Sequence, residues 1–350
     1  MKAPSKGAPE ASAPSKAEQP KFKAIWEPVN VKEDVKLVSV HFVTPEEGWV
    51  AGGRTDMTGG IVFHTRDGGV TWETQVGDLQ SSDRPYTGLH FLSPTLGFAA
   101  QSTGNLLRTI DAKEWTNAGT VDKRHTDYTF TSADVGFVVG GQTIQRTSDG
   151  GRRWQPVYEC RVKAEVNGLM RDMTCEFDKI FFMNANLGYA VSRGLEGGAG
   201  FVLAKTTDGG ATWVPSVILP GSDAKDGGLW FTSENHGVLR TVDGKFFYTD
   251  DGGKVWTGAS GQMDGSPAIE FADPGVGWMI SYRIMTYTTD GGKHWLSRQI
   301  DFPAPVRAFS LVSRDCGYAV GEHGMAYKYR IVPIEYAVKG MLAAPAMPAK

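Results

Sequence analysis

Residues 65–73 read TRDGGVTWE, and further copies of this phrase show how the chain is organised. Self-similarity at a regular spacing is typical of repeat architectures, so the phrase divides the sequence into units. A degenerate copy at 109–115, TIDAKEW, keeps the threonine, the aspartate and the tryptophan but lacks both glycines. The full copies are TSDGGRRWQ from Thr147, TTDGGATWV from Thr206, TDDGGKVWT from Thr249 and TTDGGKHWL from Thr288.

A second phrase alternates with the first. It begins with a large apolar residue, continues through five polar or small residues and ends in glycine and a short apolar run, as in FVTPEEGWVAGG from Phe42. The shared glycine marks seven units, and the last unit has no TRDGG-like phrase. The seven glycines are Gly48, Gly97, Gly136, Gly188, Gly237, Gly277 and Gly317.

Each unit contains four short β-rich runs separated by turn residues, with no helical period. Four strands in a unit of roughly forty residues is the period of a β-propeller blade. A solenoid of stacked hairpins shares this period but needs capping repeats. We therefore expect an all-β, seven-bladed β-propeller with four-stranded antiparallel blades over residues 22–330. We interpret residues 1–21 as a disordered leader and residues 331–350 as a C-terminal tail.

The ends of the chain suggest how the ring closes. The seventh unit supplies three evident strands, whereas KAIWEPVNV at 23–31 resembles the Trp-led fourth strand of the other units. We expect this segment to complete the last blade, which removes an open sheet edge. The alternative fourth strand is RIVPIEYAV at 330–338.

The TRDGG-like phrase matches the Asp-box, also called the BNR repeat, between the third and fourth strands. We expect a folded turn held by the Asp and Thr side chains, with glycines at positive φ and a tryptophan buried between blades. Three functional interpretations of the phrase are disfavoured. A calcium loop needs more oxygen ligands than the phrase offers, and a phosphate loop needs a following helix, where strands are expected here. An active site needs one asymmetric set of groups, not several copies of one phrase. The expected structural residues are Asp67, Asp111, Asp149, Asp208, Asp251, Asp290, Trp72, Trp154, Trp213, Trp256 and Trp295.

Composition and motifs restrict the classes of function. The net charge of −3 argues against nucleic-acid binding over the whole chain, and no run of about 18 apolar residues could span a membrane. The sequence has no Gly-x-Ser-x-Gly, His-Glu-x-x-His or Cys-x-x-Cys motif. We therefore expect no catalytic residue, no metal and no cofactor, and we expect a monomer. Residues 1–20 lack the apolar core of a secretory signal, which leaves open a cytoplasmic protein or an exported one whose signal is not in this chain.

The face of the ring opposite the Asp-boxes is the candidate binding surface. It carries the loops between second and third strands and the connections between blades, where cationic residues recur. Arginine binds carboxylates bidentately, so this arginine face could bind an acidic peptide segment. A scatter of solvated arginines is the alternative. The candidate partner-binding residues are Arg54, Arg84, Arg124, Arg193, Arg283, Arg307 and His323.

The connection at 156–178 departs furthest from the period of the repeat. It contains Cys160 and Cys175, which would form a disulfide in an oxidising compartment and are otherwise two free thiols. Leu169 and Met170 either form an exposed contact or fold back onto the neighbouring blades. We favour a partner contact, because long loops in a regular scaffold often carry function.

The joint pattern resembles the photosystem II assembly/stability factor family over about residues 24–330. The phrases GWVAGG, GFVVGG and GYAVGE carry this resemblance together with the Asp-boxes. It implies a non-enzymatic scaffold, exported to the thylakoid lumen or, in a non-photosynthetic bacterial relative, to the periplasm. Photosynthetic members bind the precursor of a reaction-centre subunit through an arginine-rich patch, so the implied partner is a membrane-complex subunit.

A carbohydrate-binding protein or glycoside hydrolase of the Asp-box propeller type is the alternative. Sialidases carry Asp-boxes, but on a six-bladed ring with an Arg triad and an early FRIP-like phrase, which is absent here. Other glycosidases need two carboxyl groups about 5–10 Å apart, and the sequence does not single out such a pair.

Overall fold

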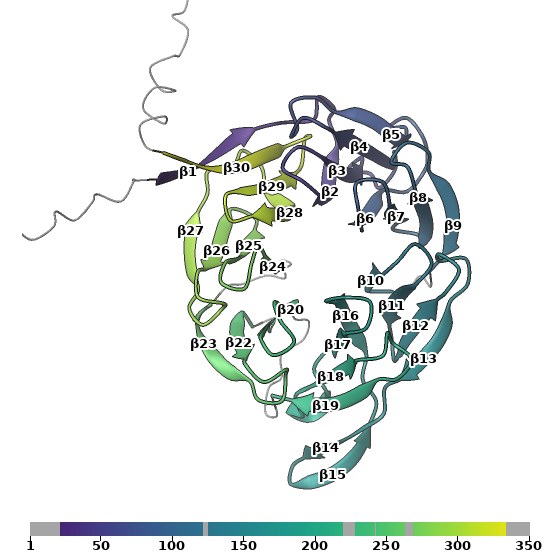
Figure 1. The fold of residues 1–350 in the computed structure, drawn as a ribbon, viewed down its shortest axis with the longest axis vertical. Helices are drawn as coiled ribbons and strands as arrows, with labels where there is room; N and C mark the ends of the chain where they lie inside the picture. Colours follow the sequence, from purple (N-terminus) through teal and green to yellow (C-terminus); the bar gives the residue numbers. More distant parts are fainter. Residues whose placement is uncertain (1–21, 122–124, 220–227, 242, 263–268, 334–350) are drawn as a thin grey trace, which may run out of the picture.

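Seven four-stranded antiparallel sheets form a ring in the part of the chain that the computed structural model describes (Figure 1). The described residues are 22–333, except 122–124, 220–227, 242 and 263–268. The predicted seven-bladed β-propeller is confirmed. The predicted leader at 1–21 and the tail from 334 onward lie outside the described residues.

The first six blades run in chain order from an inner strand to an outer strand (Figure 1). The first three blades are β2–β5 (Lys36–Phe42, Gly48–Gly53, Ile61–Thr65, Glu73–Gly77), β6–β9 (Tyr86–Phe91, Gly97–Gln101, Asn105–Thr109, Thr116–Thr120) and β10–β13 (Asp127–Phe130, Gly136–Gly140, Thr143–Thr147, Gln155–Glu159). The next three are β16–β19 (Phe177–Phe182, Gly188–Ser192, Phe201–Thr206, Val214–Ile218), β20–β23 (Gly228–Phe231, Gly237–Arg240, Lys245–Thr249, Thr257–Gln262) and β24–β27 (Glu270–Phe271, Gly277–Ser281, Ile284–Thr288, Leu296–Gln299).

The last blade joins the two ends of the described chain. It contains β28 (Val306–Ser313), β29 (Cys316–Gly321) and β30 (Ala326–Pro333), and β1 (Phe22–Pro28) pairs antiparallel with β30. The predicted closure by the N-terminal segment is therefore confirmed. Since β30 reaches Pro333, it takes in the first residues of the predicted C-terminal tail.

The Phe-x5-Gly phrase makes the same packing contact in the first six blades, and the seventh has Leu311 in place of the phenylalanine. A Cβ atom on Gly48 would lie 2.3 Å from Cγ of Phe42, so only glycine leaves room for the ring. The Phe42 ring stacks on Tyr318 of the preceding blade, with centroids 3.4 Å apart and planes 2° apart. The same stack recurs at Phe91 on Trp49, Phe130 on Phe98, Phe182 on Phe137 and Phe231 on Tyr189.

The Asp-box tryptophan packs edge-on against this phenylalanine. Trp72 meets Phe42 of its own blade at 6.3 Å and 86°, and its Nε1 donates to the carbonyl of Val29 at 2.9 Å. Trp213 contacts both Phe137 of the third blade and Phe182 of the fourth. Much of the hydrophobic core thus consists of aromatic contacts between neighbouring blades. In the first six blades the phenylalanine of one repeated phrase meets the tryptophan of the other.

Candidate partner-binding face

The Asp-box forms a closed set of hydrogen bonds. Thr65 Oγ1 donates to Asp67 Oδ1 at 2.9 Å and accepts from the N–H of Gly69 at 2.8 Å, while Thr71 N donates to Asp67 Oδ1 at 2.9 Å. Hydrogen bonds, chiefly from the Thr71 hydroxyl, lower the pKa of Asp67 to about 2. The carboxylate is used by the turn itself. The same Thr–Asp bond recurs at Asp149, Asp208, Asp251 and Asp290.

The degenerate copy in the second blade keeps the turn without its glycines. Asp111 still accepts from Thr109 Oγ1 at 3.2 Å and from the N–H groups of Lys113 and Glu114 at 2.9 Å. Ala112 takes the left-handed backbone conformation, with φ of 55°, that the first glycine has elsewhere. Its N–H donates to the carbonyl of Thr95 at 3.2 Å, as Gly68 does to Glu46 at 2.7 Å.

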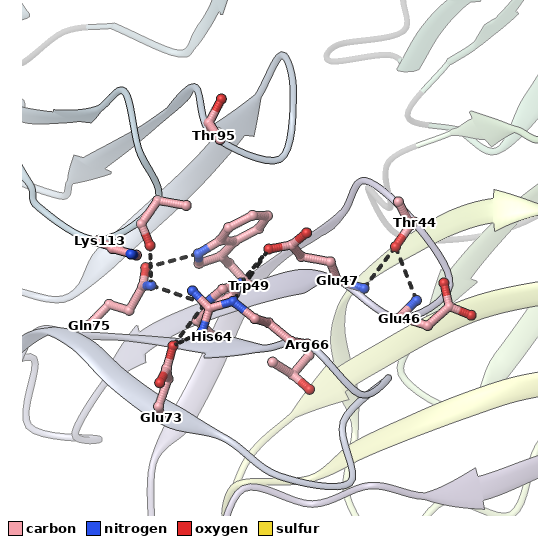
Figure 2. Close-up of polar contacts among 12 residues, drawn as sticks. Thr44, Glu46, Glu47, Trp49, His64, Arg66, Glu73, Gln75, Thr95 and Lys113 are labelled. Carbon is pink, nitrogen blue, oxygen red and sulfur yellow. Dashed lines mark hydrogen bonds and ion pairs between the residues drawn. The ribbon is translucent and has the colours of Figure 1, made fainter.

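A polar cluster lies on the Asp-box face of the first blade (Figure 2). His64 is fully buried and stacks on Trp49 at 4.4 Å. Its Nδ1 is 3.1 Å from Glu73 Oε1, and its Nε2 is 3.2 Å from Glu47 Oε1. Desolvation lowers the pKa of His64, and the nearby carboxylates oppose this. Buried completely, the ring has no open path to a substrate, so we assign the cluster a structural role.

Gln75 connects this cluster to the second blade. Its Oε1 accepts from Trp49 Nε1 at 3.0 Å and from Trp115 Nε1 at 3.2 Å. Sequence reasoning missed this group because no motif marks it. An alignment of the third strands of the units would have singled out His64, because it occupies a position that holds Arg or Lys in several other blades. There Arg146, Lys205 and Lys328 lie over the rings of Phe137, Tyr189 and Tyr318.

The predicted arginine-face residues lie where the topology of the blades places them, with two exceptions. Arg307 lies within β28, where a connection was expected, so that prediction was wrong in detail. Arg124 lies outside the described residues. Arg84 precedes β6 in the connection between the first two blades. Arg54, Arg193, Arg283 and His323 follow the second strands of the first, fourth, sixth and seventh blades.

Carboxylates of this chain form ion pairs with most of these cations. Arg54 lies 2.8 Å from Asp56, Arg307 2.5 Å from Glu322 and His323 2.9 Å from Asp34. Arg193 lies 3.3 Å from Asp178 and 3.8 Å from Glu176. Arg84 and Arg283 instead donate to the backbone carbonyls of Met57 and Pro303, at 3.2 and 3.0 Å.

Tyr282 brings two of the arginines together. The guanidinium of Arg307 lies 5.8 Å from the centre of its ring, and Arg283 follows it in the chain. Tyr282 is 60% exposed and has φ of 54°, in the left-handed region that bulky residues rarely adopt. Met57 and His323, in the equivalent loops of the first and seventh blades, also have positive φ. Such backbone costs about 1–3 kcal/mol each and clusters at functional sites. Sequence reasoning did not foresee these conformations.

Two partly buried carboxyl groups lie on inner strands. Glu270 Oε2 accepts from the N–H of Leu311 at 2.6 Å, and Asp127 Oδ2 accepts from the N–H of Ile180 at 3.1 Å. Burial raises the pKa of Glu270 to about 7 and also raises that of Asp127. Glu270 belongs to the sixth blade and Asp127 to the third, and each accepts a backbone N–H from the inner strand of the following blade. The described residues contain no group of three His, Cys, Asp or Glu that could hold a metal.

Within the stretch 156–178, where we expected a long loop, residues 162–173 form a β-hairpin, and the two ends of the stretch belong to β13 and β16. β14 (Val162–Val166) pairs with β15 (Leu169–Met173), and a disulfide joins Cys160 to Cys175 at its base. Leu169 and Met170 are 60% and 64% exposed, so they do not fold back onto the blades. No helix among the described residues is long and apolar enough to cross a membrane.

Comparisons with known proteins agree with the fold. Residues 107–266 match the model of a family described as photosynthesis system II assembly factor YCF48, and no curated protein matches. A solved structure titled "YCF48 bound to D1 peptide" is 20% identical, with a TM-score of 0.59 over 91% of this chain and 99% of that one. YCF48 from Cyanidioschyzon merolae is 17% identical, with a TM-score of 0.63 over 87% and 98%. A catalytically inactive virginiamycin B lyase from Staphylococcus aureus is 11% identical, with a TM-score of 0.61 over 89% and 100%. The resemblance to the photosystem II assembly factor family is thereby confirmed through residues 107–266, and the solved structures share the fold of the whole ring.

Proposed function

We propose that the chain is a non-enzymatic binding scaffold, an assembly factor that docks a protein partner on the face opposite the Asp-boxes. The match of residues 107–266 to the family of YCF48 assembly factors supports this role. The solved relative that binds a D1 peptide supports a peptide segment as the ligand. We further propose that the protein acts after export, in the thylakoid lumen or the periplasm, on a subunit of a membrane complex.

The observation that carries the proposal is the pair of exposed arginines around Tyr282. Arg283 donates to the carbonyl of Pro303 and has no ion pair with any described residue, while Glu322 holds Arg307 over the Tyr282 ring. A partner carboxylate can bind Arg283 and take the place of Glu322 on Arg307. Charge-assisted bidentate bonds of this kind are about twice as strong as neutral ones. The flat exposed ring between them offers apolar contact to a side chain of the partner.

The positions of the two partly buried carboxyl groups, Glu270 and Asp127, support a role without catalysis. A glycosidase needs one acid and one base on either side of a single bond. Glu270 and Asp127 instead accept backbone N–H groups of the seventh and fourth blades, respectively. A glycoside hydrolase remains the alternative to test, because a carboxyl group with a pKa of about 7 suits a general acid. Loss of glycosidase activity in Glu270→Gln would support that alternative.

Charge reversal on the binding face tests the proposal. The variant changes Arg54, Arg283 and Arg307 to Glu, and the ligand is the D1 peptide that the solved relative binds. We expect the Kd, measured by titration calorimetry, to rise at least about tenfold, because several attractive charge pairs become repulsive. The melting temperature shows whether the variant is folded.

The matched control reverses three exposed cations on the Asp-box face, namely Arg152, Arg153 and Lys254. It has the same change in net charge, so it removes long-range attraction equally but leaves the proposed site intact. An equal loss of affinity in both variants, or no loss in the first, would contradict the proposed face. Absence of binding by the unaltered protein would contradict the D1 peptide as ligand.

A further inference from the structure

The hairpin β14–β15 is an arm that projects from the ring beside the third and fourth blades (Figure 1). Its two strands pair from Val162↔Met173 to Val166↔Leu169 and meet in a two-residue turn. Asn167 and Gly168 in that turn have φ of 53° and 77°, which suits the tight turn of a regular hairpin. Because the disulfide joins the buried Cys160 and Cys175, the base of the arm is held in place.

Only half of one face of this arm is covered by the propeller. Ala164 and Val166 of β14 are buried in the core between the third and fourth blades. Residues directly opposite in an antiparallel pair share a face, so Leu169 and Arg171 of β15 face the same way. Both are exposed nevertheless. The apolar face therefore continues past the edge of the ring without a covering element.

A cleft of about 840 Å³ lies along this uncovered half. Its lining includes Arg171 and Met173 of β15, and Leu195 and Gly197 from the loop that follows β17. Arg193 also lines the cleft but is paired with Asp178 and Glu176. Arg171 has no ion pair with any residue that the structure describes, so it is the unneutralised cation of this cleft.

The outer edge of β15 carries unused backbone groups. In a hairpin with a two-residue turn, Val166↔Leu169 is a hydrogen-bonded pair, and such pairs alternate with non-hydrogen-bonded ones. The N–H and C=O groups of Leu169, Arg171 and Met173 therefore point toward β14. Those of Met170 and Asp172 point away from it, and no described backbone group bonds to them. An unpaired strand edge is a template for another strand.

We propose that this edge binds an extended segment of a partner protein as a third, antiparallel strand over the cleft. The partner chemistry follows from β15, which presents Arg171 and Met173 to the cleft and Leu169 on the same face of the strand. The complementary strand carries an acidic residue opposite Arg171, with apolar residues opposite Leu169 and Met173. On the outer side it carries a basic residue opposite Asp172. This surface is separate from the Tyr282 region and does not depend on it.

A labelled synthetic peptide with the core Val-Lys-Glu-Leu-Val tests the proposal, because antiparallel pairing sets its glutamate opposite Arg171. We expect saturable binding to the full chain by fluorescence anisotropy. Met170→Pro removes an edge N–H without touching the bonds to β14, and we expect at least about tenfold weaker binding. Met170→Thr keeps that N–H and is the matched control, with a smaller loss.

A charge swap at Arg171 provides the second part of the test. We expect Arg171→Glu to weaken binding of the glutamate peptide at least about tenfold, and a peptide with lysine at that position to restore it. Restoration requires direct pairing, which a general loss of folding would not produce. Failure of the unaltered protein to bind the peptide, unchanged binding by Met170→Pro, or no rescue by the lysine peptide would each overturn the proposal. Reversal of Arg54, Arg283 and Arg307 leaves this binding unchanged, so the two sites are tested separately.

Discussion

The carboxyl group of Glu270 should make the propeller less stable as the pH rises from about 4.5 to about 7. The group is partly buried, accepts the N–H of Leu311 at 2.6 Å and has a pKa raised by desolvation from 4.5 to about 7. Between these two values the folded chain holds a proton that the unfolded chain has released. The full contribution to stability is therefore present below pH 4.5, and it is lost as the pH rises to about 7.

The size of this effect follows from the change in proton affinity. Raising a pKa from 4.5 to about 7 corresponds to about 3 kcal/mol, because each tenfold change in affinity is 1.36 kcal/mol. Glu270→Gln removes the charge and keeps a carbonyl oxygen that can accept from Leu311. We expect the variant to match the unaltered protein near pH 4.5 and to be more stable by up to about 3 kcal/mol at pH 8.

Urea denaturation at several pH values between 4.5 and 8 measures this difference directly. The quantity of interest is the free energy of unfolding of the variant minus that of the unaltered protein, because all other titrating groups cancel in it. Glu165→Gln on the exposed side of β14 is the control for removing one carboxyl group from the protein surface. A Glu270→Gln difference that is flat, or that falls as the pH rises, would refute the reasoning.

Two further predictions concern the repeated phrases. Gly48→Ala should lower stability by about 1–3 kcal/mol, because the new Cβ would lie 2.3 Å from the Phe42 ring. Gly258→Ala, which meets no atom within 4 Å, should leave the melting temperature almost unchanged, and equal effects would contradict this account. Asp208→Asn should destabilise the fourth blade at neutral pH, since the pKa of Asp208 is lowered to about 2 by hydrogen bonds led by that from Thr212. The destabilisation by Asp208→Asn should shrink as the pH falls from about 4 through 2, because the carboxylate of the unaltered protein then becomes protonated. Thermal melts measure it, and an undiminished destabilisation at pH 2 would argue against the Asp-box hydrogen bonds as its source.

Local repeats made the fold predictable. The Phe-x5-Gly and Asp-box phrases each describe contacts made within one unit, such as Phe42 over Gly48 and Thr65 on Asp67. Counting them is enough to give the number of blades. The closing strand was also predictable, because its Trp-led pattern at 23–31 copies a fourth strand that the seventh unit lacks.

Less of the candidate site than of the fold could be predicted from the sequence. The loop positions of Arg54, Arg193, Arg283 and His323 followed from the topology of the blades, and the structure places them there. Their pairing did not follow, because Asp34 reaches His323 from the far end of the chain and Glu322 reaches Arg307 across a strand pair. Nor did the left-handed backbone of Tyr282, which no rule for turn residues would assign to a tyrosine.

Sequence alone therefore establishes the blade count and the turn chemistry, and it predicts the face on which to look for a partner. All three depend on contacts between residues close together in the chain, which recur and can be counted. Tertiary structure alone shows which cations are neutralised, that the stretch between Cys160 and Cys175 is a projecting hairpin, and that β15 has an unpaired edge beside a cleft. These features depend on single, unrepeated contacts between distant segments, so no periodicity in the sequence reveals them.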